Sequence, residues 1–76
     1  MYEQIKELIL NYVEVDPDAV TPDSKFIEDL GFNSFDFMSM LGELEDTLGV
    51  TVDENEIAGL STVQDAVDYL EKLKNA

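Results

Sequence analysis

The chain has 76 residues, 45% of them apolar, and its 18 acidic residues against four lysines give a formal net charge of −14. A surface this negative repels phosphate groups, which excludes nucleic acids and anionic membranes as partners. The chain contains no histidine and no cysteine, so the usual general base, the thiol nucleophile, disulfides and thiolate metal sites are absent. The two stretches that could imitate a calcium loop, at Asp16 and Asp53, lack the further acid and the glycine that such a loop needs. We therefore expect neither an enzyme nor a metal site.

The length predicts a single domain, residues 1–76, with one small core. No apolar run approaches the roughly 20 residues that span a bilayer, and no basic, apolar leader opens the chain. We expect a monomeric, cytoplasmic protein. Its charge favours rapid, salt-dependent association with basic patches on partner proteins.

The helical spacing of apolar residues predicts a first helix over residues 2–13, which Pro17 prevents from continuing. A long connection follows, from Asp16 to Gly31. A connection of this length in a compact domain usually has a function, and we expect it to be ordered. Four of its apolar side chains are expected to lie on the core, namely Val20, Phe26, Ile27 and Leu30.

Three more helices are predicted, over residues 34–48, over residues 54–58 and from residue 61 onward. Gly49 ends the first of these as a C′ residue, and Asp53 can cap the second. Ser61 and Gln64 form a capping-box pattern at the start of the last. Residues 50–52 are all β-branched, but the sequence offers no second strand to pair with them. The predicted fold class is all-α, a four-helix bundle with a long first loop and a short third helix.

The helix over residues 34–48 has two apolar surfaces. Phe35 and Met38 project outward, near Gly42 and among acidic residues. Single exposed apolar residues are common, but apolar residues ringed by acids beside an accessible serine indicate a docking surface. At about 100° per residue, the opposite stripe faces the core. It consists of Phe37, Met40, Leu41, Leu44 and Leu48.

Ser34 stands at the head of this helix, where both Asn33 and Ser34 are suitable N-cap residues. Composition and spacing alone favour an ordinary capping serine. Residues 30–35, however, read Leu-Gly-Phe-Asn-Ser-Phe, which resembles the Leu-Gly-x-Asp-Ser-Leu motif that opens the second helix of acyl carrier proteins. Residues 24–31 and 61–70 extend the resemblance, so that it covers nearly the whole chain.

The resemblance implies that Ser34 carries a 4′-phosphopantetheine arm, moved from coenzyme A by a separate, basic phosphopantetheinyl transferase that uses Mg²⁺. The thiol of the arm would hold acyl groups as thioesters for fatty-acid, polyketide or related biosynthetic enzymes. The expected partner-binding surface comprises Asn33, Phe35, Asp36, Met38, Glu43, Glu45 and Asp46. Five residues between the second and third helices are expected to line an acyl pocket, although the same side chains also suit an ordinary core. They are Met40, Leu44, Ile57, Leu60 and Val63.

Three departures from the family pattern predict a specialised carrier rather than the carrier of primary fatty-acid synthesis. Asn33 replaces an aspartate, which removes a charge beside the target of the transferase. Phe35 replaces a leucine, and together with Phe32 and Phe37 it crowds aromatic rings around the serine. Gly42 stands where carriers of primary fatty-acid synthesis present a bulky apolar residue. The alternatives are an aminoacyl or peptidyl carrier, and a helical interaction module that has lost the arm.

Overall fold

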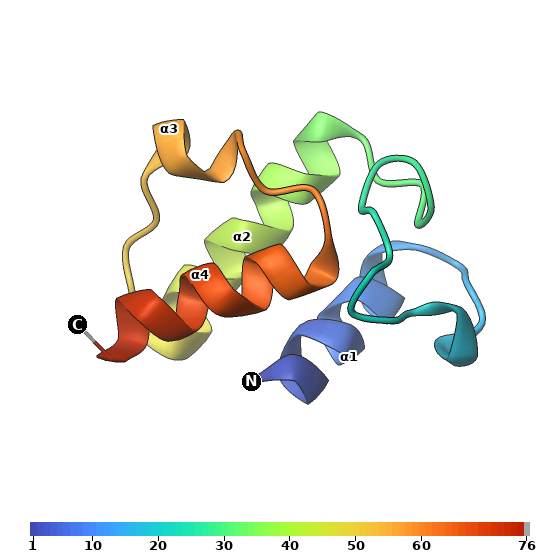
Figure 1. Ribbon diagram of the computed structural model, residues 1–76, viewed down its shortest axis with the longest axis horizontal. Coiled ribbons are helices and arrows are strands. Elements are labelled where there is room, and N and C mark those ends of the chain that lie inside the picture. The colour runs from blue at the N-terminus through green and yellow to red at the C-terminus, as the bar shows by residue number, and fades with distance from the viewer. Residues whose placement is uncertain (76) are drawn as a thin grey trace.

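The computed structural model describes residues 1–75, which form a helical bundle around one core (Figure 1). No strand occurs among these residues, and the strand-like pairing found there is an isolated antiparallel bridge between Lys25 and Thr62. No helix in the same part of the chain is long and apolar enough to cross a membrane. The predicted all-α fold is confirmed. Its elements are α1 (Tyr2–Tyr12), the single-turn 3-10 helix η1 (Pro17–Ala19), α2 (Ser34–Leu48), α3 (Glu54–Ile57) and α4 (Val63–Asn75).

Both ends of α2 lie where the sequence predicts them. The side chain of Asn33 accepts a 2.7 Å hydrogen bond from the backbone N–H of Asp36, so Asn33 is the N-cap. Gly49 ends the helix with φ at 69°, in the left-handed region that a glycine enters without a Cβ penalty. Two other ends differ by one residue. Val13 is already extended, so α1 ends at Tyr12, and α3 ends at Ile57 with Ala58 as its cap.

The capping box predicted at Ser61 and Gln64 is wrong by one residue. The Thr62 hydroxyl accepts from the N–H of Asp65 at 3.1 Å, and Asp65 accepts in return from the N–H groups of Ser61 and Thr62. These backbone hydrogen bonds lower the pKa of the Asp65 carboxyl. Gln64 instead donates to Asp68 along the helix surface. The cap is displaced because Ser61 belongs to the extended segment, where its carbonyl accepts from the N–H of Phe26.

The long connection between α1 and α2 is ordered, as predicted, and it is attached to the start of α4. The Phe26 N–H donates to the Ser61 carbonyl at 3.0 Å, and the Val63 N–H donates to the Ser24 carbonyl at 2.9 Å. Ser24 is buried, and its hydroxyl donates to the Ala19 carbonyl and accepts from the Thr21 N–H. These hydrogen bonds satisfy the polar groups that the connection brings inside.

Two apolar residues of the connection lie where the sequence did not place them. Ile27, expected on the core, is 54% exposed. Phe32, expected beside Ser34, is only 2% exposed and packs edge-on against Phe26, with ring centroids 5.5 Å apart. Phe37 packs on the other side of Phe26, at 4.9 Å. Phe32 therefore belongs to an aromatic cluster around Phe26 rather than to a crowd of rings around the serine, whereas Phe37 joins this cluster and also lies beside Ser34 in a shared cavity.

The core draws on α1, α2, α4 and the connection, which together bury the apolar stripes of the three long helices, and α3 adds Ile57. The predicted core stripe of α2 is confirmed for four of its five members, and Phe37 is half-buried. The side chains that are almost completely buried are Phe26, Ile5, Ile9, Met40, Leu41, Leu44, Leu70 and Val63.

Candidate functional site

Ser34 is the first residue of α2, and it is exposed. Because the Asn33 side chain caps the helix, the Ser34 hydroxyl is not needed for that purpose. It makes no hydrogen bond to any part of the chain that the structure describes. Gly31, with φ at 79°, lets the chain reverse just before the helix, while Asp29 closes the preceding turn by accepting from the Lys25 N–H. The result is a free hydroxyl on a helix terminus that is held by a capping hydrogen bond.

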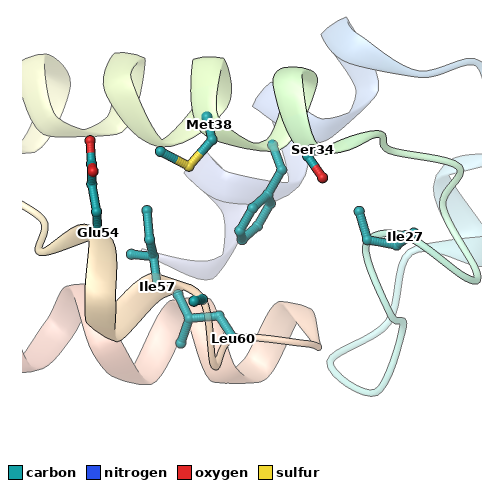
Figure 2. A pocket seen from close by; sticks show the side chains of 8 residues that line it. Ile27, Ser34, Met38, Glu54, Ile57 and Leu60 are labelled. Carbon is teal, nitrogen blue, oxygen red and sulfur yellow. The ribbon is translucent and has the colours of Figure 1, made fainter.

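A cavity of about 260 Å³ opens beside Ser34, between the first half of α2 and the short helix α3 (Figure 2). Its walls are apolar except for the serine and one carboxylate, Glu54 at the start of α3. Figure 2 shows the Met38 side chain reaching from α2 toward Ile57, with Ile27 beyond the serine. The lining residues are Ile27, Ser34, Phe37, Met38, Glu54, Ile57, Ala58 and Leu60.

The cavity agrees only in part with the acyl pocket expected from the sequence. Ile57 and Leu60 line it. Met40, Leu44 and Val63 do not line it; all three are buried in the core. Ile27 is a wall residue that the sequence does not identify, since an apolar residue in a loop carries no signal that separates a cavity wall from a core position.

The seven residues expected to bind partners differ in how far their side chains are exposed to solvent. Phe35 is 78% exposed, and Met38 is 43% exposed although its side chain also forms part of the cavity wall. Asp46 is exposed and Asp36 is partly covered. Helix α2 contains no lysine or arginine, so every charged side chain on its outer face is negative. The role of these seven residues in partner binding stays a prediction.

Two of the seven residues expected to bind partners, Glu43 and Glu45, also accept hydrogen bonds within the protein. The Tyr12 hydroxyl donates a 2.7 Å hydrogen bond to Glu43, which raises the pKa of Tyr12 to about 12. Glu45 accepts from the Val52 N–H at 2.9 Å and so holds the link that leads from α2 to α3. Sequence periodicity places both residues at the surface but gives no indication of these tertiary bonds.

Gly42 lies in the interior of α2, where glycine is less stable than alanine by about 1 kcal/mol. The two glycines with positive φ are Gly31 and Gly49, so Gly42 has an ordinary helical backbone. A Cβ atom added at Gly42 would meet nothing within 4 Å. Neither backbone conformation nor close packing within the described residues requires a glycine here.

The model of the family described as phosphopantetheine attachment site matches residues 3–70. The acyl carrier protein of Solidesulfovibrio magneticus is 36% identical over 72 residues, which cover 95% of this chain and 92% of the relative. That of Campylobacter concisus is 37% identical over 73 residues, covering 96% and 95%. The chain belongs to the acyl carrier protein family. Among solved structures, the acyl carrier protein from Enterococcus faecalis matches with a TM-score of 0.82 and 28% identity, covering 95% of this chain and 91% of that one.

Acyl carrier proteins are carriers rather than enzymes, and the cofactor of the family is 4′-phosphopantetheine. The residues of this carrier fit such a group. A covalent arm needs an exposed and unengaged hydroxyl, and Ser34 provides one. A cargo at the end of an arm needs apolar surface close by, and the cavity beside Ser34 provides it.

Proposed function

We propose that Ser34 is the attachment point of the phosphopantetheine arm and that this protein carries acyl groups between biosynthetic enzymes. The observation that supports this most directly is the free hydroxyl at the head of α2, next to an apolar cavity. In the loading step the Ser34 oxygen forms a bond to the phosphorus that bears the pantetheine. The pyrophosphate bond of coenzyme A breaks, adenosine bisphosphate leaves, and the serine proton passes to a base of the transferase. When bound, the arm supplies the thiol that holds the acyl group.

The residues of the chain position the arm, attract partner enzymes and shield the cargo. Asn33 caps α2 through the Asp36 N–H and so holds the start of the helix without forming a hydrogen bond to the Ser34 hydroxyl. The negative outer face of α2 attracts basic patches on the transferase and on the enzymes that use the cargo. Ile27, Ile57 and Leu60 offer apolar contact to an acyl chain near the arm.

We infer a specialised carrier, for fatty-acid, polyketide or related synthesis, rather than the carrier of primary fatty-acid synthesis. Asn33, Phe35 and Gly42 support this inference because they depart from the family pattern at the N-cap of α2 and within that helix. We place the protein in the cytoplasm, where coenzyme A and its biosynthetic partners meet, and expect it to act as a monomer with one domain, residues 1–76.

An aminoacyl or peptidyl carrier is the second candidate, and one observation favours it. The carboxylate of Glu54 stands in the otherwise apolar lining of the cavity, where it could pair with the ammonium group of an amino acid. Preparation of the carrier from its native cell and mass analysis of the bound group would separate the two candidates.

The test of the carrier function is co-expression with a broad-specificity phosphopantetheinyl transferase, followed by intact mass measurement. The wild-type protein should gain the mass of one phosphopantetheinyl group, and Ser34→Ala should gain none. Ser39→Ala, a change to a second serine in the same helix, is the matched control and should be loaded like the wild type. An unmodified wild-type protein would favour the remaining alternative, a helical interaction module without an arm.

A further inference from the structure

Phe37 contributes an aromatic ring to the wall of the cavity beside Ser34. The same ring packs against Phe26, with the ring centroids 4.9 Å apart. Phe26 is buried, and its ring also meets Phe32 at an interplanar angle of 90°. Phe37 is therefore supported by the core, and the aromatic part of the cavity wall is held in place before any cargo arrives.

Tyr12 supports this arrangement from α1. Its ring lies against Phe32, with the centroids 6.0 Å apart, and its hydroxyl donates the 2.7 Å hydrogen bond to Glu43 of α2. The rings behind Phe37 are thus attached to two helices. A wall that is ordered in advance loses little conformational freedom when a ligand packs on it, so more of the contact energy remains for binding.

Met38 places a thioether in the lining of the same cavity. Figure 2 shows its side chain extending from α2 toward Ile57 of α3. A methionine sulfur makes favourable contacts with aromatic rings, and aromatic rings pack favourably on one another in offset or edge-to-face arrangements. The aliphatic wall residues Ile27, Ile57 and Leu60 accept any apolar group. Phe37 and Met38 therefore add a preference for a cargo that is aromatic.

We propose that the cargo of this carrier is an acyl group that ends in an aromatic ring, an arylalkanoyl thioester, and that the ring rests against Phe37 and Met38. The volume agrees, because an apolar cavity of about 150 Å³ holds a benzene molecule and this cavity measures about 260 Å³. A neutral ring also suits the charge of the site, since Glu54 and the net charge of −14 disfavour a cargo with a second carboxylate. This inference rests on the proposed function at Ser34 and names the class of its cargo.

The experiment compares two cargoes with the same carbon skeleton, phenylbutanoyl and cyclohexylbutanoyl. A broad-specificity transferase loads each one with its arm from the corresponding coenzyme A thioester. Hydrolysis of the thioester is measured on the carrier and on free coenzyme A, and the ratio of the two rates is the protection factor. In the wild type this factor should be about fivefold larger for the phenylbutanoyl cargo, as for an aromatic pair.

Phe37→Leu should abolish the difference between the two cargoes, and Met38→Leu should reduce it. Both cargoes are compared within each variant, so a general loosening of the bundle affects the two protection factors alike. Phe35→Leu is the matched control, because Phe35 is a phenylalanine of the same helix that is exposed and lies outside the cavity lining. It should keep the wild-type difference.

Equal protection factors for the two cargoes in the wild type would overturn the inference. A difference that persists in Phe37→Leu, or an equal loss in Phe35→Leu, would overturn it as well. Each of these results is obtained on a loaded carrier and leaves the proposed function intact. A wild-type protein that accepts neither arm would refute the proposed function together with the inference.

Discussion

The hydroxyl of Tyr12, the last residue of α1, donates a 2.7 Å hydrogen bond to Glu43 in the middle of α2. The bond joins residues 31 positions apart in the sequence. The neutral phenol is the donor, so loss of its proton would break the bond and place two negative charges together. The pKa of Tyr12 is accordingly raised to about 12, first by the hydrogen bond and then by desolvation and the neighbouring charges.

This bond makes stability depend on pH in the alkaline range. The pKa of Tyr12 is higher in the folded protein than its ordinary value of 10.0, so the contribution is complete below that value. It is lost as the pH rises through about 12. We expect an ultraviolet titration of the wild type to show a late tyrosine phase that disappears in Tyr12→Phe and moves to lower pH in Glu43→Gln. A late phase that persists in Tyr12→Phe would show that another group produces it.

Asn33 should stabilise the fold by capping α2, and its lack of charge should slow attachment of the arm to Ser34. Asn33→Ala removes the bond to the Asp36 N–H and should lower the free energy of unfolding by about 1 kcal/mol, measured in urea. Asn33→Asp keeps an acceptor and adds a negative charge at the positive end of α2, so it should not be less stable. It also restores the family motif, and a broad-specificity transferase should load it faster than the wild type. Equal loading rates would argue against Asn33 as a mark of specialisation.

Gly42→Ala should raise the free energy of unfolding by about 1 kcal/mol, because the new methyl group enters open space on a helix with ordinary backbone angles. Chemical denaturation with an unchanged m value is the appropriate measurement. The contrasting variant is Gly49→Ala, which must adopt positive φ and should be less stable than the wild type. A decrease for Gly42→Ala would reveal a packing constraint on α2 in solution.

The capping box of α4 can be assigned by two substitutions. Thr62→Ala removes the acceptor for the Asp65 N–H and should lower the free energy of unfolding by about 1 kcal/mol. Ser61→Ala should change it little, because Ser61 contributes backbone groups rather than its hydroxyl.

The lowered pKa of Asp65 means that its ionised form is favoured by folding. Its contribution is therefore present above the ordinary value of 3.8 and is lost as the pH falls through the folded-state pKa.

Ile27 should matter for cargo more than for stability. Ile27→Ser alters an exposed side chain, so the free energy of unfolding should change by less than about 0.5 kcal/mol. The same change makes one wall of the cavity polar, and the thioester of a loaded medium-length alkanoyl chain should hydrolyse faster than in the wild type. Thr47→Ser, outside the cavity, is the control. Unchanged hydrolysis in Ile27→Ser would indicate that the chain does not rest in this cavity.

The sequence by itself determined the features that depend on neighbouring residues. The sequence predicts the helical periodicity, the caps at Asn33 and Gly49 and the serine at the head of α2, because each depends on residues within a few positions of one another. The negative charge follows from the composition. The same local pattern carried the motif by which the chain resembles acyl carrier proteins, and the comparisons confirm the family.

Only the tertiary structure decided which apolar residues are core and which are cavity wall. Phe32 and Ile27 belong to one loop and are both apolar, yet one joins the aromatic cluster while the other lies beside Ser34. The Glu43 and Glu45 bonds and the displaced cap of α4 likewise depend on segments far apart in the chain. Such contacts form only when the bundle closes, and residue type alone does not encode which side of a loop will face the core.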